Sequence, residues 1–132
     1  MSIEQNKQIA CAFLLALAAH DAKRGSELLH EDLRYWTCGK PHLFPYAGER
    51  NKTEFCKYLA SPSIFVGGGK MTPLVLTGED NRVSMTAESI GVTPDGRTYT
   101  NVYHYLFTFL DGKIVEVREY MDTQSAAEFF GF

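Results

Sequence analysis

One carboxylate in this sequence stands in a row of apolar side chains. If residues 113–121 form a β-strand, alternation places Val115, Val117, Glu119 and Met121 on one face. Burial raises the pKa of a carboxyl group unless a partner compensates, and such acids are common in active sites. Glu119 is therefore the first candidate for general acid and base chemistry. The alternative is structural: the strand end frays, and Glu119 reaches solvent past the edge of the sheet.

The other reactive side chains have simpler structural interpretations. Alternation places His104 on the opposite face of its strand, where we expect a histidine of an interface. Asp122 immediately precedes a predicted helix, and capping of the helix N-terminus explains an aspartate there. Cys11, Cys38 and Cys56 form neither a CxxC pair nor a zinc-ligand spacing with the four histidines. We therefore expect reduced thiols and no structural metal.

Four helices are predicted around these residues. Two capping-box patterns, Ser2 with Gln5 and Asn51 with Glu54, mark helix starts, since each side chain satisfies a free backbone donor of the other residue. The predicted helices span 2–19, a short segment from 21, 51–59 and 122–130. The segment 38–50 contains prolines and glycine, which predict a loop, and we interpret it as a candidate lid.

The rest of the chain alternates with the period of β-strands. The predicted strands are 33–37, 71–77, 82–93, 97–110 and 113–121, and the last four are separated by the turns GEDN, PDG and LDG. Three helices thus precede a strongly curved antiparallel or mixed sheet, and a short helix follows it. We predict an α+β fold in which residues 1–132 form a single domain.

The longest predicted strand is apolar on both faces. One face carries Tyr99, Asn101, Tyr103, Tyr105, Phe107 and Phe109, and the other carries Val102, His104, Leu106 and Leu110. The helices of this chain can cover one face only. Because the other would remain an exposed apolar patch, we predict a homodimer through the outer face of the sheet.

Composition excludes some classes of partner. The formal net charge is −3 and no basic cluster is present, so neither nucleic acid nor an anionic membrane is an expected partner. The longest apolar run, residues 9–19, is too short to span a bilayer and has no basic segment before it. We therefore expect a cytoplasmic protein that binds a small molecule.

The C-terminal strands resemble a known family. The stretch TPDGRTYTNVYHYLFTFLDGKIVEVREYMDT is similar to the SnoaL-like polyketide cyclases and the limonene epoxide hydrolases, within the cystatin-like cone-fold group that includes the ketosteroid isomerases. The earlier LLHEDLRYW looks like the first strand of those families. The resemblance implies a sheet that curls around a deep pocket plugged by helices, with dimerisation through the outer sheet face.

The same resemblance implies specific roles for pocket residues. The acid of the epoxide hydrolases in the final strand falls on Glu119, their second acid on Glu88, and the tyrosine that helps hold the attacking water on Tyr35. Two positions depart from the pattern, because the arginine that bridges the acids is replaced by Thr86 and a water-binding asparagine by Thr37. Without that arginine, two facing carboxylates would repel, so we expect one of them to hold a proton near neutral pH.

Two functions are compatible with this pocket. The first is an enzyme of the isomerase, cyclase, dehydratase or hydrolase type, in which Glu119 and Glu88 act as base and acid, and Tyr35 and Asn101 bind the developing enolate oxygen. The second is a non-catalytic module that binds the same hydrophobic, oxygenated ligand. Neither requires a cofactor or a metal. We expect the ligand to contact Asn101, Tyr103, Phe107, Thr86, Thr37, Ile90, Val117, Met121, Phe13 and Leu17.

Overall fold

The helices begin at the residues that the sequence marks as caps. The computed structural model describes residues 2–132. At the start of α1 (Ile3–Ala19), the Gln5 N–H donates to Ser2 Oγ at 3.1 Å and the Ser2 N–H donates to Gln5 Oε1 at 2.9 Å. The other helices, α2 (Ala22–Leu28), α3 (Lys52–Ala60) and α4 (Thr123–Phe130), follow the caps Asp21, Asn51 and Asp122. The capping interpretation of Asp122 is confirmed.

Six strands form one mixed sheet. They are β1 (Leu29–Thr37), β2 (Gly48–Asn51), β3 (Lys70–Glu79), β4 (Arg82–Val92), β5 (Thr98–Leu110) and β6 (Lys113–Met121). Their order is β2-β1-β6-β5-β4-β3, in which β1 and β6 run parallel and the other neighbours antiparallel. Asp111 and Gly112 both have positive φ in the tight turn between β5 and β6, as an Asp-Gly hairpin turn requires.

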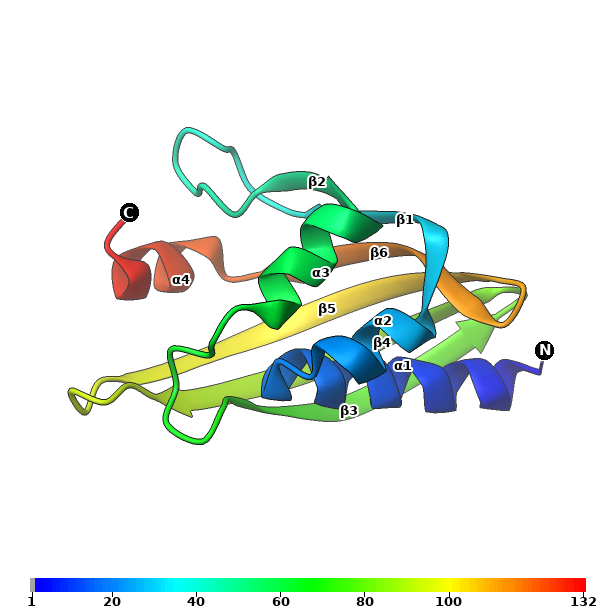
Figure 1. Cartoon of the computed structure of the whole chain (residues 1–132), viewed down its shortest axis with the longest axis horizontal. Helices are drawn as coiled ribbons and strands as arrows, with labels where there is room; N and C mark the ends of the chain where they lie inside the picture. The colour runs from blue at the N-terminus through cyan, green and yellow to red at the C-terminus, as the bar shows by residue number, and fades with distance from the viewer. Residues whose placement is uncertain (1) are drawn as a thin grey trace.

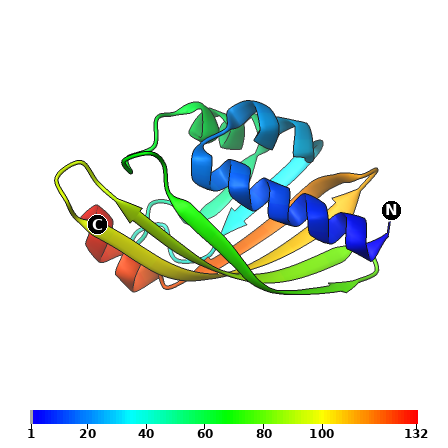
Figure 2. The same cartoon turned by 90° about the horizontal axis from the view of Figure 1, so that it is seen from below.

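The sheet is bent into a trough that holds three helices. Figure 2 shows α1, α2 and α3 on its concave side, and Figure 1 shows α4 following β6 in the half of the molecule away from the N-terminus. Helix α1 contacts β3 and β4, whereas α3 lies against β1 and β2. The α+β prediction is therefore confirmed, with an open, strongly curved sheet.

Two features of the N-terminal half differ from the prediction. Strand β1 begins at Leu29 rather than at residue 33, with an irregularity before Arg34. A short strand, β2, lies inside the segment predicted to be a loop, where Arg50 pairs with Tyr35 of β1. Four residues carry too little periodicity to reveal a strand, and the pairing that creates β2 joins segments distant in sequence.

A β-bulge changes the faces of β6. Near the turn, Phe109 pairs with Ile114, but Thr108 pairs with Glu116, so Val115 is the extra residue. Ile114 is fully buried, while Val115 is only half-buried. The prediction that Val115 shares the inner face is therefore wrong, whereas Val117 and Glu119 do lie inside.

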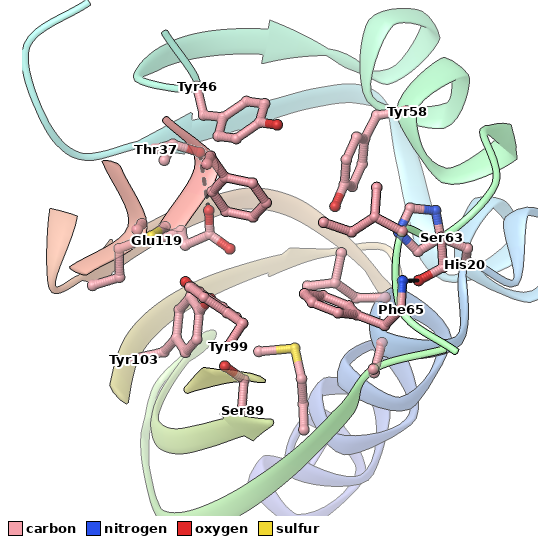
Figure 3. Close-up of a pocket in the computed structure, with 18 of the residues that line it drawn as sticks. His20, Thr37, Tyr46, Tyr58, Ser63, Phe65, Ser89, Tyr99, Tyr103 and Glu119 are labelled. Carbon is pink, nitrogen blue, oxygen red and sulfur yellow. Dashed lines mark hydrogen bonds between the residues drawn. The ribbon is translucent and has the colours of Figure 1, made fainter. Parts of the chain in front are cut away.

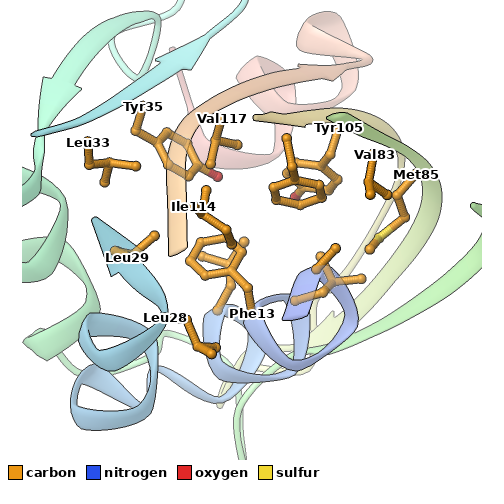
Figure 4. Packing of buried hydrophobic residues seen from close by; sticks show 14 of the residues in the cluster. Phe13, Leu28, Leu29, Leu33, Tyr35, Val83, Met85, Tyr105, Ile114 and Val117 are labelled. Carbon is orange, nitrogen blue, oxygen red and sulfur yellow. The ribbon is translucent and has the colours of Figure 1, made fainter. Parts of the chain in front are cut away.

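A single large cluster of buried apolar residues fills the trough (Figure 4). Phe13 of α1 packs edge-on against Phe107 of β5, with ring centroids 6.0 Å apart. Val117 is fully buried in the same cluster. These three residues were predicted to contact the ligand, but they belong to the core that supports the pocket.

The convex face of the sheet leaves apolar side chains exposed. Leu74, Val75, Val92, Val102 and Leu110 are each more than two-fifths exposed. Between residues 2 and 132, no helix combines the length and the apolar character needed to cross a membrane.

Candidate functional site

Three neighbouring strands bring polar side chains to the same level of the inner face. Glu119 of β6 lies opposite Tyr105 of β5 on one side and beside Thr37 of β1 on the other. Tyr35 lies two residues before Thr37 and therefore on the same face of β1. Strand pairing alone thus gathers one carboxylate and three hydroxyl groups.

All three hydroxyls donate hydrogen bonds to the carboxylate. Glu119 Oε2 accepts from Tyr35 Oη at 2.9 Å and from Tyr105 Oη at 3.0 Å, and Oε1 accepts from Thr37 Oγ1 at 3.1 Å. Figure 3 shows the carboxylate directed into a cavity. Because Oε1 accepts only one hydrogen bond from residues 2–132, it keeps a lone pair available for a ligand.

Burial and hydrogen bonding oppose each other at this carboxylate. Burial raises the pKa of Glu119 above its usual value, while the hydroxyls of Tyr35, Tyr105 and Thr37 and the more distant charge of Arg50 lower it. The upward effect is the larger. Glu119 is therefore a better proton acceptor than an exposed glutamate, which favours general base chemistry.

The two tyrosines remain donors because ionisation is unfavourable for them. Burial and the neighbouring Glu119 raise the pKa of both Tyr35 and Tyr105 well above the usual range. Their rings are also held in place by stacking: Tyr35 on Phe55 at 4.1 Å and Tyr105 between Tyr103 and Phe107 at 5.6 Å from each. The geometry around Glu119 is thus fixed before a ligand binds.

The cavity has a volume of about 370 Å³. Glu119 is the one carboxylate that lines it among residues 2–132. Aromatic and aliphatic side chains supply most of the wall, among them Leu17, Phe44, Phe55, Ile64, Phe65, Met71, Met121 and Phe130. This size and lining suit an apolar molecule of one to three rings that presents a few polar atoms.

A second polar group, Tyr103 with Tyr99, lies near Glu119 on the same side of the cavity (Figure 3). Tyr103 Oη and Tyr99 Oη share a hydrogen bond of 3.0 Å. The nearby Ser89 Oγ is buried in the wall and has no partner with hydrogen-bond geometry in residues 2–132. Because a buried unpaired hydroxyl is unfavourable, Ser89 is a position where a ligand atom would restore a hydrogen bond.

Asn101 does not line this cavity. Its Oδ1 accepts from the backbone N–H groups of Val102 and Asp122, and its Nδ2 donates to Tyr99 Oη at 2.7 Å and to the Asp122 carbonyl at 3.0 Å. Both amide protons are therefore occupied. Asn101 therefore has no amide proton free for the enolate oxygen that it was predicted to bind, and it instead holds Tyr99, which lines the cavity and bonds Tyr103.

Glu88 lies on the outer face of the sheet. It pairs with Val102 of β5 and is exposed, whereas its neighbour Ala87 points into the core. Thr86 is also outside, where its Oγ1 accepts from the Val75 N–H at 3.2 Å. The predicted pair of facing carboxylates does not exist, because β4 turns Thr86 and Glu88 away from the cavity.

The other predicted residues divide between cavity and core. Tyr35 and Thr37 contact Glu119 as described. The remaining predicted residues that line the cavity are Tyr103, Met121, Leu17 and, at the rim, Ile90.

Several lining residues were not predicted. Tyr105 was placed on the inner face but received no role, although its pairing with Glu119 follows once the bulge is known. Arg50, Tyr46 and Tyr58 come from β2, the preceding loop and α3, which fold over the cavity through long-range contacts. The prediction that segment 38–50 is a lid indicated Tyr46 and Arg50 only in general terms, and no signal indicated Tyr58.

No group of three potential metal ligands occurs in the part of the chain that the structure describes. The four histidines are dispersed. His20, for example, lines the far end of the cavity, where its Nδ1 bonds the Ser61 carbonyl at 2.8 Å.

Comparison with known proteins identifies the family. The model of the SnoaL-like domain matches residues 10–117, and the chain therefore belongs to the SnoaL-like domain family. A search of curated proteins gives no match.

Solved structures share the fold at low identity. TerC, co-crystallised with polyporic acid, has a TM-score of 0.81 and 18% identity over 97% of this chain and 99% of that one. An epoxide hydrolase of M. tuberculosis, similar to limonene epoxide hydrolase, has a TM-score of 0.76 and 16% identity over 98% of each chain. An NTF2-like protein from Burkholderia pseudomallei K96243 has a TM-score of 0.80 and 16% identity over 97% of each chain. At these identities the likeness shows the fold, and it confirms the predicted resemblance.

Proposed function

We propose that this protein is a small-molecule enzyme of the SnoaL-like class that moves a proton next to a carbonyl group. The observation that carries the proposal is the single carboxylate, Glu119, held by three hydroxyls in an apolar cavity of about 370 Å³. A half-buried carboxylate with a raised pKa, directed into a ligand-sized cavity, is a common arrangement of a general base. The substrate is a hydrophobic molecule with one or more oxygen atoms, and the proposed reaction uses no cofactor.

In the first step, Glu119 Oε1 takes a proton from the carbon next to the carbonyl. The electrons of the broken C–H bond form a C=C bond, and the carbonyl becomes an enolate. The hydroxyls of Tyr103 and Ser89, which line the same cavity, donate to the enolate oxygen. Burial raises the pKa of Tyr103, which keeps this phenol protonated and able to donate.

In the second step, the same carboxyl group returns its proton to a different carbon. Alternatively, the enolate carbon attacks a second carbonyl to close a ring, and the alkoxide formed from that carbonyl takes the proton from the carboxyl group. An isomerisation or cyclisation of this kind needs only one acid–base residue. Epoxide opening by water needs a base for the water and an acid for the epoxide oxygen. Because Glu88 lies outside, the cavity supplies only one carboxylate and favours the proton shuttle.

A second candidate function is ligand binding without catalysis. One observation favours it: hydrogen bonds from three hydroxyls stabilise the Glu119 carboxylate, so a catalytic role is not needed to explain a carboxylate at this position. TerC, which shares the fold, was crystallised with polyporic acid, a precedent for a ligand complex in this fold.

Deuterium exchange distinguishes the two functions. The bicyclic ketone 2-tetralone, whose protons next to the carbonyl are acidic, is incubated with protein in D₂O, and deuterium uptake is followed by mass spectrometry. We expect exchange above the solvent rate, and a loss of about 10²-fold or more in Glu119→Gln. Glu88→Gln is the matched control, because it makes the same change on the outer face and should leave the rate unaltered.

Two outcomes contradict the catalytic proposal. Equal rates of deuterium exchange with Glu119→Gln and with the wild type would show that Glu119 is not the base. Binding of 2-tetralone, measured by calorimetry, without exchange at any pH would favour the ligand-binding function.

A further inference from the structure

The cavity is lined by an arginine, Arg50, that forms no ion pair with the carboxylates of residues 2–132. Arg50 is half-buried. Its one hydrogen bond, from Nη1 to the Tyr46 carbonyl at 2.8 Å, leaves most of its N–H groups free. Partly buried charges are normally paired, so the free guanidinium is a position where a ligand anion would be stabilised.

Strand pairing fixes where this cation sits. Arg50 of β2 lies opposite Tyr35 of β1, whose ring faces the cavity and donates to Glu119. Arg50 is level with Tyr35 and Glu119 with Thr37, so two strand spacings of about 4.8 Å and a two-residue offset of about 6.6 Å separate their backbones by about 12 Å. Their side chains do not meet, although the charge of Arg50 lowers the pKa of Glu119 and that of Tyr58. Arg50 thus acts on the same cavity without neutralising its carboxylate.

Two phenols complete the site. The hydroxyls of Tyr46 and Tyr58 point toward the cavity in Figure 3, and neither has a hydrogen-bond partner in residues 2–132. Burial raises the pKa of Tyr58 to about 12, so this phenol stays a donor. A guanidinium and two protonated phenols together offer a positive charge and several N–H and O–H donors to a bound group, which suits an anionic oxygen.

We propose that Arg50, with Tyr46 and Tyr58, binds an anionic oxygen of the ligand, so that the cavity selects ring compounds bearing a carboxylate or an ionised enol or phenol. The anionic group lies toward β2 and α3, and the ring system extends toward Glu119. The inference concerns the same cavity as the proposed function, but it requires binding only and not turnover.

A matched pair of probes isolates the charge. The probes are 2-naphthoate and 2-naphthamide, which share the ring system and differ mainly in the negative charge. Their dissociation constants are measured by isothermal titration calorimetry at neutral pH. We expect the wild type to prefer 2-naphthoate by about tenfold, because a hydrogen bond to a charged group is stronger than one to a neutral group.

Variants of Arg50 separate charge from structure. Arg50→Gln should abolish the preference mainly by weakening 2-naphthoate, while Arg50→Lys should keep part of it. Lys70→Gln removes a cation from another part of the cavity rim and should leave the preference intact. Urea unfolding of each variant shows whether it is folded, and the ratio of the two affinities cancels a general loss of binding.

Each remaining outcome overturns the inference. These are equal affinities of the wild type for the two probes, no binding of either probe, an unchanged ratio in Arg50→Gln, or an equal loss of the ratio in Lys70→Gln. The result is independent of the exchange test: anion preference without deuterium exchange leaves an anion-binding module, and exchange without anion preference leaves the proposed catalysis standing.

Discussion

The hydrogen bond from Tyr105 to Glu119 links the ionisation of the carboxylate to the stability of the protein. Tyr105→Phe removes the donor 3.0 Å from Glu119 Oε2 and keeps a ring that can stack between Tyr103 and Phe107. Tyr105 is fully buried, so we expect no water to replace the lost hydroxyl. The variant therefore probes one hydrogen bond with little change in packing.

The expected magnitude depends on the charge of Glu119. A hydrogen bond to a charged group contributes about 1.5–3 kcal/mol, and one between neutral groups about 0.5–1.5 kcal/mol. Tyr105→Phe should therefore lower the free energy of unfolding by about 2 kcal/mol when Glu119 is ionised and by about 1 kcal/mol when it is protonated. The difference of about 1 kcal/mol corresponds to a further rise in the Glu119 pKa of about 0.7 unit.

The sign of the pH dependence follows from the raised pKa. Burial makes the folded protein hold the Glu119 proton more tightly than the unfolded chain does. The contribution of this group to stability is therefore complete below its unfolded-state pKa and is lost as the pH rises through its folded-state pKa. Because Tyr105→Phe raises the folded-state pKa further, its destabilisation should grow with pH across the same window.

Urea unfolding from pH 4.5 to 8.5, in steps of about one unit, measures this effect. To separate the contribution of other titrating groups, the Tyr105→Phe substitution is repeated in a Glu119→Gln background. There the destabilisation by Tyr105→Phe should not depend on pH. Tyr58→Phe is the control, since that phenol lines the cavity without bonding Glu119. A destabilisation that is flat with pH, or that varies equally in the Gln background, would refute the reasoning.

Two further predictions concern Ser89 and the outer face. Ser89→Ala should raise the free energy of unfolding of the ligand-free protein by about 1 kcal/mol in urea, because it removes a buried hydroxyl without a partner; a loss of stability would show that the hydroxyl is satisfied. We also propose that the exposed apolar face around Val102 joins two copies of the chain, so Val102→Lys should convert a dimer to a monomer in sedimentation velocity. A wild-type protein that sediments as a monomer at its highest soluble concentration would contradict this proposal.

Local signals in the sequence were sufficient for most elements of the fold. The capping boxes at Ser2 and Asn51 placed two helix starts correctly, and Asp-Gly in the last turn placed the hairpin of β5 and β6. Such signals act within a few residues of each other, so they are readable in one chain. The short strand β2 was missed because β1, the strand with which it pairs, lies more than ten residues away.

The candidate site was harder to predict because it is assembled from distant segments. Glu88 was predicted to be a pocket acid because its position matches an acid of the epoxide hydrolases. Burial along β4, however, places Val83, Met85 and Ala87 inside and Glu88 outside. The alternation in the sequence is weak there, since Thr86 and Ser84 are small and polar, and the apolar Ile90 is exposed at the cavity rim. Arg50 was missed because only the folding of β2 over the cavity gives that residue a role.

The bulge at Val115 decides whether this protein has a carboxylate in its cavity at all. The two-residue turn pairs Leu110 with Lys113, and if that register continued unbroken, Glu119 would lie opposite His104 on the outer face. One extra residue shifts the register, so that Glu119 lies opposite Tyr105 inside. The acid, its tyrosine donor and the neighbouring β1 hydroxyls are therefore not independent features: a single irregularity in β6 brings the carboxylate to the hydroxyls that β1 and β5 already direct inward. In a regular hairpin the same sequence of side chains would bury Tyr105 without its acceptor and leave Glu119 in solvent, and no proton could be exchanged with a ligand in the cavity.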